Sequence, residues 1–170
     1  MDLSVRLHAD QDPSQRAQMA MLAGRLGYSA VIAPPGLDPD EIVRLGLVAD
    51  DADHDAVLVH RADPDQVHTA RAKAGPNGRV VVDVAVSIGR TRSEAAARAA
   101  RDPRFAGAAH PQVAGIFGTL EQAQGLVLEL ARAGADELRV TLADEIDVAD
   151  LLAQTRALVA GPTRALLDNG

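Results

Sequence analysis

A helix-opening pattern that recurs at regular intervals constrains this chain more than any other feature. Three segments begin with Asp-Pro and carry Gln or Glu two residues after the proline: Asp12–Gln15, Asp38–Glu41 and Asp63–Gln66. An Asp side chain accepts hydrogen bonds from free amides at a helix start, and proline suits the first helical position. Gln or Glu three residues after the cap reaches back to the cap amide. Each segment is therefore predicted to begin a helix.

Further starts extend this pattern along the chain. Thr91–Glu94 and Thr119–Gln122 use threonine as the cap, and a sixth start is expected at Asp144 or Asp147. Starts at residues 12, 38, 63, 91 and 119 are 25 to 28 residues apart. Such regular spacing is typical of a repeated supersecondary unit.

Strand-like runs rich in β-branched residues precede these starts. Glycines at Gly27 and Gly134 stand where two amphipathic helices are expected to end. Six strand–helix units predict an α/β fold with a mostly parallel sheet and right-handed crossovers. The runs are Leu3–Ala9, Ser29–Ala33, Asp55–His60, Arg79–Ile88, the weaker Val113–Phe117, and Glu137–Leu142.

The length of the chain limits how this sheet can close. Eight such units form a barrel of about 250 residues, whereas this chain has six in 170 residues. We therefore expect one domain over residues 1–170, a reduced or incomplete (β/α)8 TIM barrel. An open doubly wound sheet and a barrel completed by a partner chain are the alternatives. Pro103–Pro111, the least regular stretch, is the expected site of a deletion.

Three of the expected strands alternate between apolar and polar residues. The apolar sets are expected to meet the helices, and the polar sets to face a lumen, solvent or another subunit. A dry lumen requires pairs such as Arg6 or Arg139 with Asp83 or Glu137, because an unpaired buried charge costs several kcal/mol. A paired network, a functional polar pocket and an exposed or interface face all remain open.

Composition excludes several classes of function. The net charge is −7 and Lys73 is the single lysine, so a general nucleic-acid-binding role is not expected. There is no cysteine for thiol catalysis or thiolate metal sites. No apolar run approaches 18 residues, and no signal-peptide pattern opens the chain. We therefore expect a soluble, cytoplasmic protein without a membrane partner.

Several segments resemble parts of one enzyme family. Ala23–Val31 resembles the opening of the luciferase-like monooxygenases, where a first helix ends in Gly-Tyr or Gly-Phe and runs into the second strand. Thr91–Ala99 is similar to a family helix with the pattern Thr-x-x-Glu-Ala-x-x-x-Ala. Phe117–Ala123 and Leu130–Leu138 are similar to the family's C-terminal Gly-Thr-Pro-Glu-x-Val helix and Ala-Gly-Val-Asp-Glu-Leu strand entry. Together they indicate a shortened member of the luciferase-like flavin- or F420-dependent family.

This resemblance implies an oxidoreductase or monooxygenase that binds FMN or F420. Family members often carry His or Glu just past the second strand, near the cofactor ring, but this chain has Ala33–Gly36 there, with no proton-transferring side chain. The departure and the missing barrel units favour an alternative, a non-catalytic accessory subunit or small-ligand-binding protein of the same fold. Exposed strand edges predict a homodimer or a heteromer with a related chain.

Function on such folds collects at the carboxyl ends of strands. His8 and His60 end the first and third strands and are candidate acid–base groups, since imidazole titrates near neutrality. A solvated loop histidine is the alternative for each. The acidic run Asp50–Asp55 is expected to be a solvated loop and not a metal site.

Two glycine-containing helix starts are candidate phosphate sites. Free amides and arginines at such a start attract anions, although an ordinary capped helix is the alternative for both starts. The candidate cofactor-binding residues are Ser87, Gly89, Arg90, Arg92 and Ser93 at the first, with Gly118 and Thr119 at the second.

Overall fold

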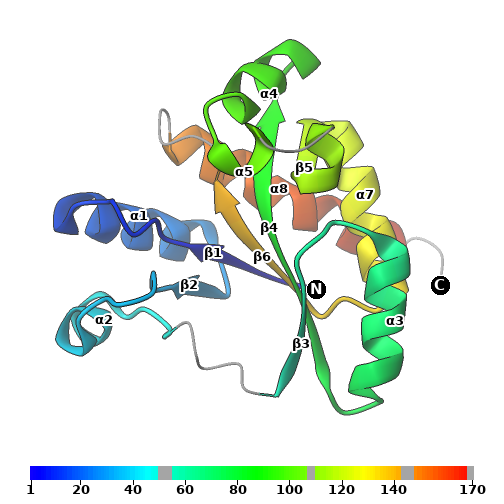
Figure 1. The fold of residues 1–170 in the computed structure, drawn as a ribbon, viewed down its shortest axis with the longest axis horizontal. Coiled ribbons are helices and arrows are strands. Elements are labelled where there is room, and N and C mark those ends of the chain that lie inside the picture. The colour runs from blue at the N-terminus through cyan, green and yellow to red at the C-terminus, as the bar shows by residue number, and fades with distance from the viewer. Residues whose placement is uncertain (50–54, 107–109, 143–147, 168–170) are drawn as a thin grey trace.

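The computed structural model describes residues 1–49, 55–106, 110–142 and 148–167. These residues form six parallel strands and eight helices (Figure 1). The elements are β1 (Asp2–Arg6), α1 (Pro13–Leu26), β2 (Ala30–Ile32), α2 (Pro39–Leu45), β3 (Ala56–Val59), α3 (Pro64–Ala74), β4 (Arg79–Gly89), α4 (Arg92–Ala99), α5 (Pro103–Ala106), α6 (Pro111–Ala114), β5 (Gly115–Thr119), α7 (Leu120–Ala133), β6 (Glu137–Leu142) and α8 (Val148–Leu167).

Five helices begin at the predicted caps. Asp12 and Thr119 form complete capping boxes, and Thr91 accepts a hydrogen bond from the Glu94 amide. Asp38 and Asp63 also cap their helices, through the amide two residues further on. The sixth predicted start, at residue 144 or 147, lies outside the described residues.

The sheet has some of the strand neighbours of a barrel, but β6 pairs with β4 where a barrel would pair it with β5. Its order is β2-β1-β6-β4-β3, so the first and last strands of the chain are paired, as they are when a barrel closes. Beyond β2, an isolated bridge joins Ile32 to Val48. Within the described ranges no ladder connects this side of the sheet to β3. The predicted α/β fold with six parallel strands is confirmed, and the sheet is open between β2 and β3.

Strand β4 organises one half of the sheet because three strands pair with it. Along one edge it pairs with β3 through Arg79–Val82 and with β5 through Ala85–Gly89. Along its other edge it pairs with β6. The chain therefore steps back on itself between β4 and β5, against the direction of its other crossovers.

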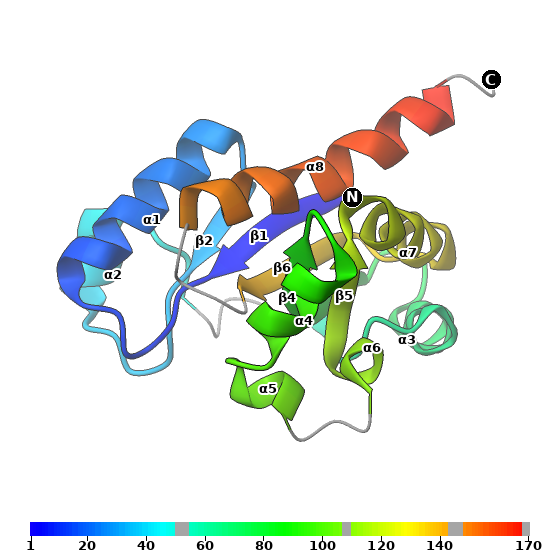
Figure 2. The same cartoon turned by 90° about the horizontal axis from the view of Figure 1, so that it is seen from above.

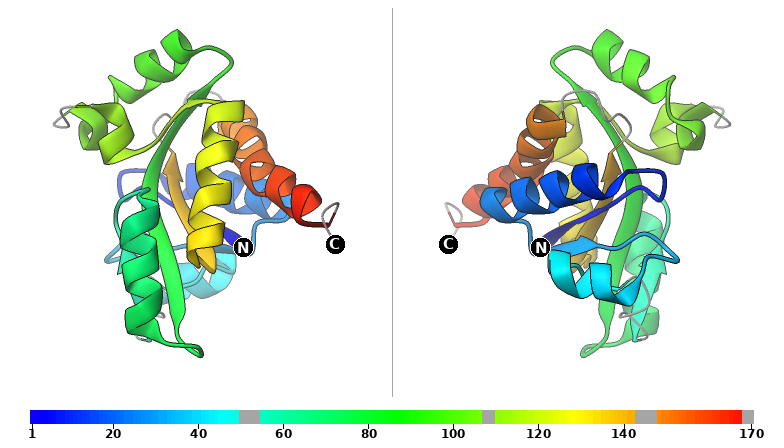
Figure 3. Two further views of the ribbon diagram at one scale, coloured as in Figure 1. Left: turned by 90° about the vertical axis from the view of Figure 1, so that its right-hand side faces the viewer. Right: turned by 90° about the vertical axis from the view of Figure 1, so that its left-hand side faces the viewer.

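This reversal decides on which face α4 lies. A right-handed crossover in the reversed direction places the connecting helix on the opposite face of the sheet. Figure 2 shows α4 and α5 on one side of the strands, with α1 and α8 on the other side. In Figure 3, α7 and α8 lie side by side on this second face. The structure thus combines barrel-like strand pairing with helices on both faces, as in a doubly wound sheet.

The alternation along the strands separates two cores. The alternating apolar residues of β1, β4 and β6 pack under α1, α7 and α8 in the main core, which confirms the predicted apolar face. On the other face, Ala85 of β4 and Phe117 of β5 pack against α4 and α5 in a smaller cluster. The Ser87 hydroxyl donates to the Ala95 carbonyl at 2.8 Å and ties α4 to β4.

The charged residues on the polar face form the predicted ion pairs. Arg6 binds Asp83 at 2.6 Å. Arg139 binds Glu137 at 3.2 Å, and Arg79 binds the same carboxylate at 2.5 Å. The Arg139 and Glu137 side chains are only 3% and 5% exposed, so their ion pair compensates two charges that burial would otherwise make costly.

Several boundaries differ from the predictions, including that of β1, which ends at Arg6 and not at Ala9. The weak strand predicted at Val113–Phe117 begins later, because Pro111 occupies the first position of α6 and places Val113 in that helix. Gly115 then starts β5 against the Ala85 carbonyl, which leaves no room for a Cβ atom. The supposedly irregular stretch from residue 103 contains α5.

Strand β3 has an apolar sequence but is only partly buried. Leu58 is 43% exposed, because β4 is the only strand paired with β3 in the described part of the chain.

The Glu137→Gln substitution is expected to destabilise the protein by about 3 kcal/mol, because it removes the buried carboxylate that binds both Arg139 and Arg79. Urea unfolding of both proteins measures the difference. Glu129→Gln on the exposed face of α7 is the matched control and is expected to change stability by no more than about 0.5 kcal/mol. Equal effects of the two substitutions would contradict the importance of the pair.

Alkaline pH should destabilise the fold through Tyr28. Its hydroxyl donates to the Leu152 carbonyl at 2.9 Å, and burial raises the pKa of Tyr28 well above its usual value of 10.0. The unfolded chain ionises first, so the free energy of unfolding should be unaffected below about pH 10 and fall above it. Phenolate absorbance reports this residue alone, since the chain has one tyrosine and no tryptophan. Ionisation of the folded protein near pH 10 would contradict the burial.

Candidate functional site

The reversal at β4 sends the connections that follow β4 and β6 to opposite faces of the sheet. The chain leaves β4 toward α4 on one face and leaves β6 toward α8 on the other face. Ligands of open α/β sheets bind outside the carboxyl ends of strands, where connections diverge in this way. We define the crevice by His8, Arg104 and the Leu142 carbonyl.

The Leu142 carbonyl at the end of β6 joins two of these groups. It lies 3.0 Å from His8 Nε2 and accepts a hydrogen bond from Arg104 Nη2 at 2.9 Å. Arg104 is oriented by the buried carboxylate of Asp102, which binds its Nε at 2.9 Å. The loop after β1 and the start of α5 are therefore fixed on the same strand end.

The carbonyl also determines how His8 is protonated. A carbonyl oxygen only accepts hydrogen bonds, so the neutral ring carries its hydrogen on Nε2 and keeps an acceptor at Nδ1. Among the described residues, no hydrogen bond occupies His8 Nδ1 or Arg104 Nη1. The crevice thus offers one acceptor and one donor from opposite sides of the Leu142 carbonyl.

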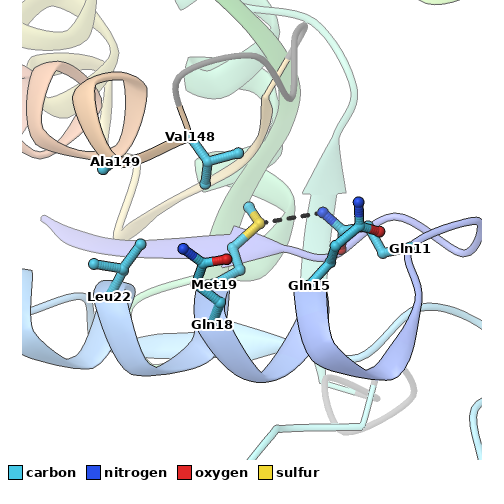
Figure 4. A pocket seen from close by; sticks show the side chains of 7 residues that line it. All are labelled: Gln11, Gln15, Gln18, Met19, Leu22, Val148 and Ala149. Carbon is cyan, nitrogen blue, oxygen red and sulfur yellow. Dashed lines mark hydrogen bonds between the residues drawn. The ribbon is translucent and has the colours of Figure 1, made fainter.

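A pocket of about 320 Å³ lies beside this loop, between α1 and the first turn of α8 (Figure 4). Gln11 connects the pocket to the crevice. Its Oε1 accepts a hydrogen bond from the His8 amide at 3.1 Å, and its Nε2 contacts the Met19 sulfur at 3.3 Å. Amide and aliphatic side chains line the pocket: Gln11, Gln15, Gln18, Met19, Leu22, Val148 and Ala149.

The two predicted acid–base histidines do not lie together. Strands β6 and β4 separate β1, which precedes His8, from β3, which precedes His60. His60 is exposed and makes no side-chain hydrogen bond with the described residues. The two histidines could lie together only if β1 and β3 were neighbours in the sheet. These strands are not adjacent, so the histidines are apart.

Internal contacts already occupy the predicted phosphate site at α4. The Glu94 carboxylate accepts a hydrogen bond from the Arg90 amide at 2.9 Å and lies at the helix start where a phosphate was expected. Gly89 packs so closely on α4 that a Cβ atom would lie 2.7 Å from the Ala95 amide. Arg92 lies over the Phe117 ring, 6.0 Å from its centroid.

The remaining predicted cofactor-binding residues also have structural explanations. Ser87 is fully buried, and Ser93 is exposed. Gly118 adopts a φ of 136° just before the capping box in which Thr119 and Gln122 satisfy each other's amides. Capping and packing account for these residues without a ligand.

Sequence reasoning missed Arg104 although a signal was present. Asp102 and Pro103 repeat the Asp-Pro pattern of the three recognised helix starts. In the structure, Asp102 accepts a hydrogen bond from the Arg104 amide at 2.8 Å. Asp38 and Asp63 likewise each accept a hydrogen bond from the amide two residues further along the chain. The pattern thus marked the segment that brings an arginine to the crevice.

The described residues contain neither a cluster of metal ligands nor a membrane-spanning helix. They contain no group of three or more potential metal ligands, although most of the acidic run at 50–55 lies outside them. In the same residues, no helix is long and apolar enough to cross a membrane.

Comparison with known proteins identifies a shared fold. No family model and no curated protein matches this chain. Among solved structures, the crystal structure of apo-MsnO8 is similar, with a TM-score of 0.61 and 14% sequence identity. The match covers 94% of this chain and 97% of that chain. At this identity the likeness shows the α/β fold alone.

Replacement of His8 tests its bond to Leu142. His8→Gln can place an amide donor near the position of Nε2, so its stability should stay close to that of the wild type. His8→Ala removes the donor and is expected to cost about 1 kcal/mol. Thermal unfolding compares the two variants, and equal losses would mean that the bond does not contribute.

Proposed function

We propose that this chain is a luciferase-like oxidoreductase that binds the ring of FMN or F420 at the crevice. The observation that supports this most is made at one strand end, where the acceptor His8 Nδ1 and the donor Arg104 Nη1 have no hydrogen bond to any described residue. The family resemblance of the sequence supports the choice of cofactor.

The chemistry of the ring suits this pair of groups. FMN and F420 share a pyrimidinedione edge on which carbonyl oxygens alternate with an N–H group. An acceptor beside a donor complements such an edge, as in sites where a few placed polar groups fix a ligand's orientation. When bound, the cofactor supplies the hydride or oxygen chemistry. His8 then holds or moves a proton at Nδ1, and Arg104 orients the ring.

The phosphate end does not fit the two helix starts to which sequence assigned it. The Glu94 carboxylate lies at the first and would repel a phosphate. At the second, the Thr119–Gln122 capping box already takes the amides. We therefore expect Arg90 and Arg92 to be dispensable for cofactor binding.

A second function is favoured by the same occupied helix starts. A non-catalytic accessory subunit, or a small-ligand-binding protein of the same fold, needs no phosphate site. Pro34, where family members often carry His or Glu, is consistent with this alternative. The open edges near Val48 and Leu58, both exposed, suit association with a second copy or a related chain.

Titration with FMN and, separately, with F420 tests the cofactor proposal. Saturable micromolar binding is expected by absorbance and fluorescence. Arg104→Lys keeps the charge beside Asp102 but loses the guanidinium fork, and should weaken binding about tenfold. The matched control, with Arg90→Ala and Arg92→Ala, should bind like the wild type. Absence of binding at about 100 µM, roughly −5.5 kcal/mol, would contradict the proposal and favour the second function.

A further inference from the structure

A second hollow of about 620 Å³ lies at the carboxyl end of β2 and is lined mainly by apolar side chains. Residues 33–37, which follow β2, form one wall, and Pro39, Ile42 and Val43 of α2 form another. Ala49 completes it. None of the described residues that line this apolar pocket has a charged or hydrogen-bonding side chain, so these residues do not compensate the desolvation of a charged ligand.

The shape of this pocket is built into the backbone. Pro34, Pro35 and Pro39 have fixed φ angles. Gly36 turns the chain with a φ of 79°, a conformation that other residues rarely adopt. A turn closes with the Leu37 amide 3.4 Å from the Pro34 carbonyl. A wall of this kind loses little conformational entropy when a ligand binds.

The apolar pocket and the crevice lie at the ends of adjacent strands. Arg6 of β1 is paired with Ile32 of β2, and the Leu7 amide continues the ladder to the Ile32 carbonyl at 3.0 Å. Two residues beyond this pair stand His8, in the segment after β1, and Pro34, in the segment after β2.

A charge pair also links the helix of the apolar pocket to the loop that carries His8. Arg16 of α1 binds Glu41 of α2 at 3.0 Å, and it also donates to the Gln11 carbonyl in that loop. Helix α2, which supplies one wall of the pocket, is thereby held beside the crevice.

We propose that the apolar pocket binds an uncharged apolar organic molecule, as the substrate or the apolar part of the substrate presented to the crevice. This proposal rests on the proposed function and names its substrate class. Where family members often have a proton-transferring side chain, this chain has a rigid apolar wall, so the proton-handling group is His8 on the neighbouring strand.

The dimensions favour a small molecule over a protein partner. The volume falls within the roughly 300–1,000 Å³ of small-molecule sites. A stable protein interface requires about 800 Å² from each partner, whereas Val43 is the only large, highly exposed apolar side chain that lines the pocket. A second copy of the chain is the competing occupant, which the experiment distinguishes.

The test is a fluorescence titration of the full chain with N-phenyl-1-naphthylamine, an uncharged apolar probe. Val43→Asp places a carboxylate in the pocket, and Val43 is 81% exposed, so folding should be retained. The matched control is Met21→Asp, at a 50% exposed apolar residue on α1 outside the pocket. Circular dichroism verifies the fold, and light scattering gives the oligomeric state of each protein.

Saturable probe binding that weakens about tenfold or more in Val43→Asp, but not in Met21→Asp, would support the proposal. Absent binding, or equal affinity in all three proteins, would overturn it. A dimer that dissociates only in Val43→Asp, without probe binding, would overturn it in favour of an interface. FMN and F420 titrations of the same proteins separate the pocket proposal from the cofactor proposal. Probe binding that depends on Val43, without binding of FMN or F420, would support the apolar pocket and contradict the proposed cofactor.

Discussion

The structure depends on the side-by-side pairing of two short strands with one long strand. Strand β4 binds β3 along its first half and β5 along its second half, on the same edge, while β6 occupies the opposite edge. The chain must therefore step backward from β4 to β5, and handedness places α4 on the opposite face from α7 and α8. Without this step all helices would cover one face, as in a barrel, and the connections after β4 and β6 would not lead to opposite faces.

The proposed site follows from this arrangement. Because α4 and α5 lie on the polar face, Arg104 reaches the end of β6 from one side while His8 reaches it from β1. The ion pair between Arg139 and Glu137 lies further down the same face and compensates charges that burial would otherwise make costly. The proposed site is thus confined to the strand ends, and the ion pairs on the polar face below them have a structural role.

Local signals in the sequence predicted the elements better than their arrangement. Caps such as Asp12 and Thr119 form hydrogen bonds within one helical turn, so the local sequence predicts them. The alternation of apolar residues in β1, β4 and β6 correctly predicted which face of the sheet is buried. The reversal at β4 depends on which strands pair, which no local pattern encodes. The predicted phosphate site at α4 overlooked Glu94, whose carboxylate acts on its own helix start. Arg104 was missed because the Asp102 cap in an irregular stretch was not recognised as a helix start.

The most direct test of the central claim, that ligands meet this protein at the crevice, is a backbone amide chemical-shift map of the ¹⁵N-labelled chain with FMN or F420. The account predicts perturbations that cluster in residues 8–11 and around Arg104. Perturbations confined to residues 89–93 and 118–119 would show that the cofactor binds at the starts of α4 and α7, and would contradict binding at the crevice.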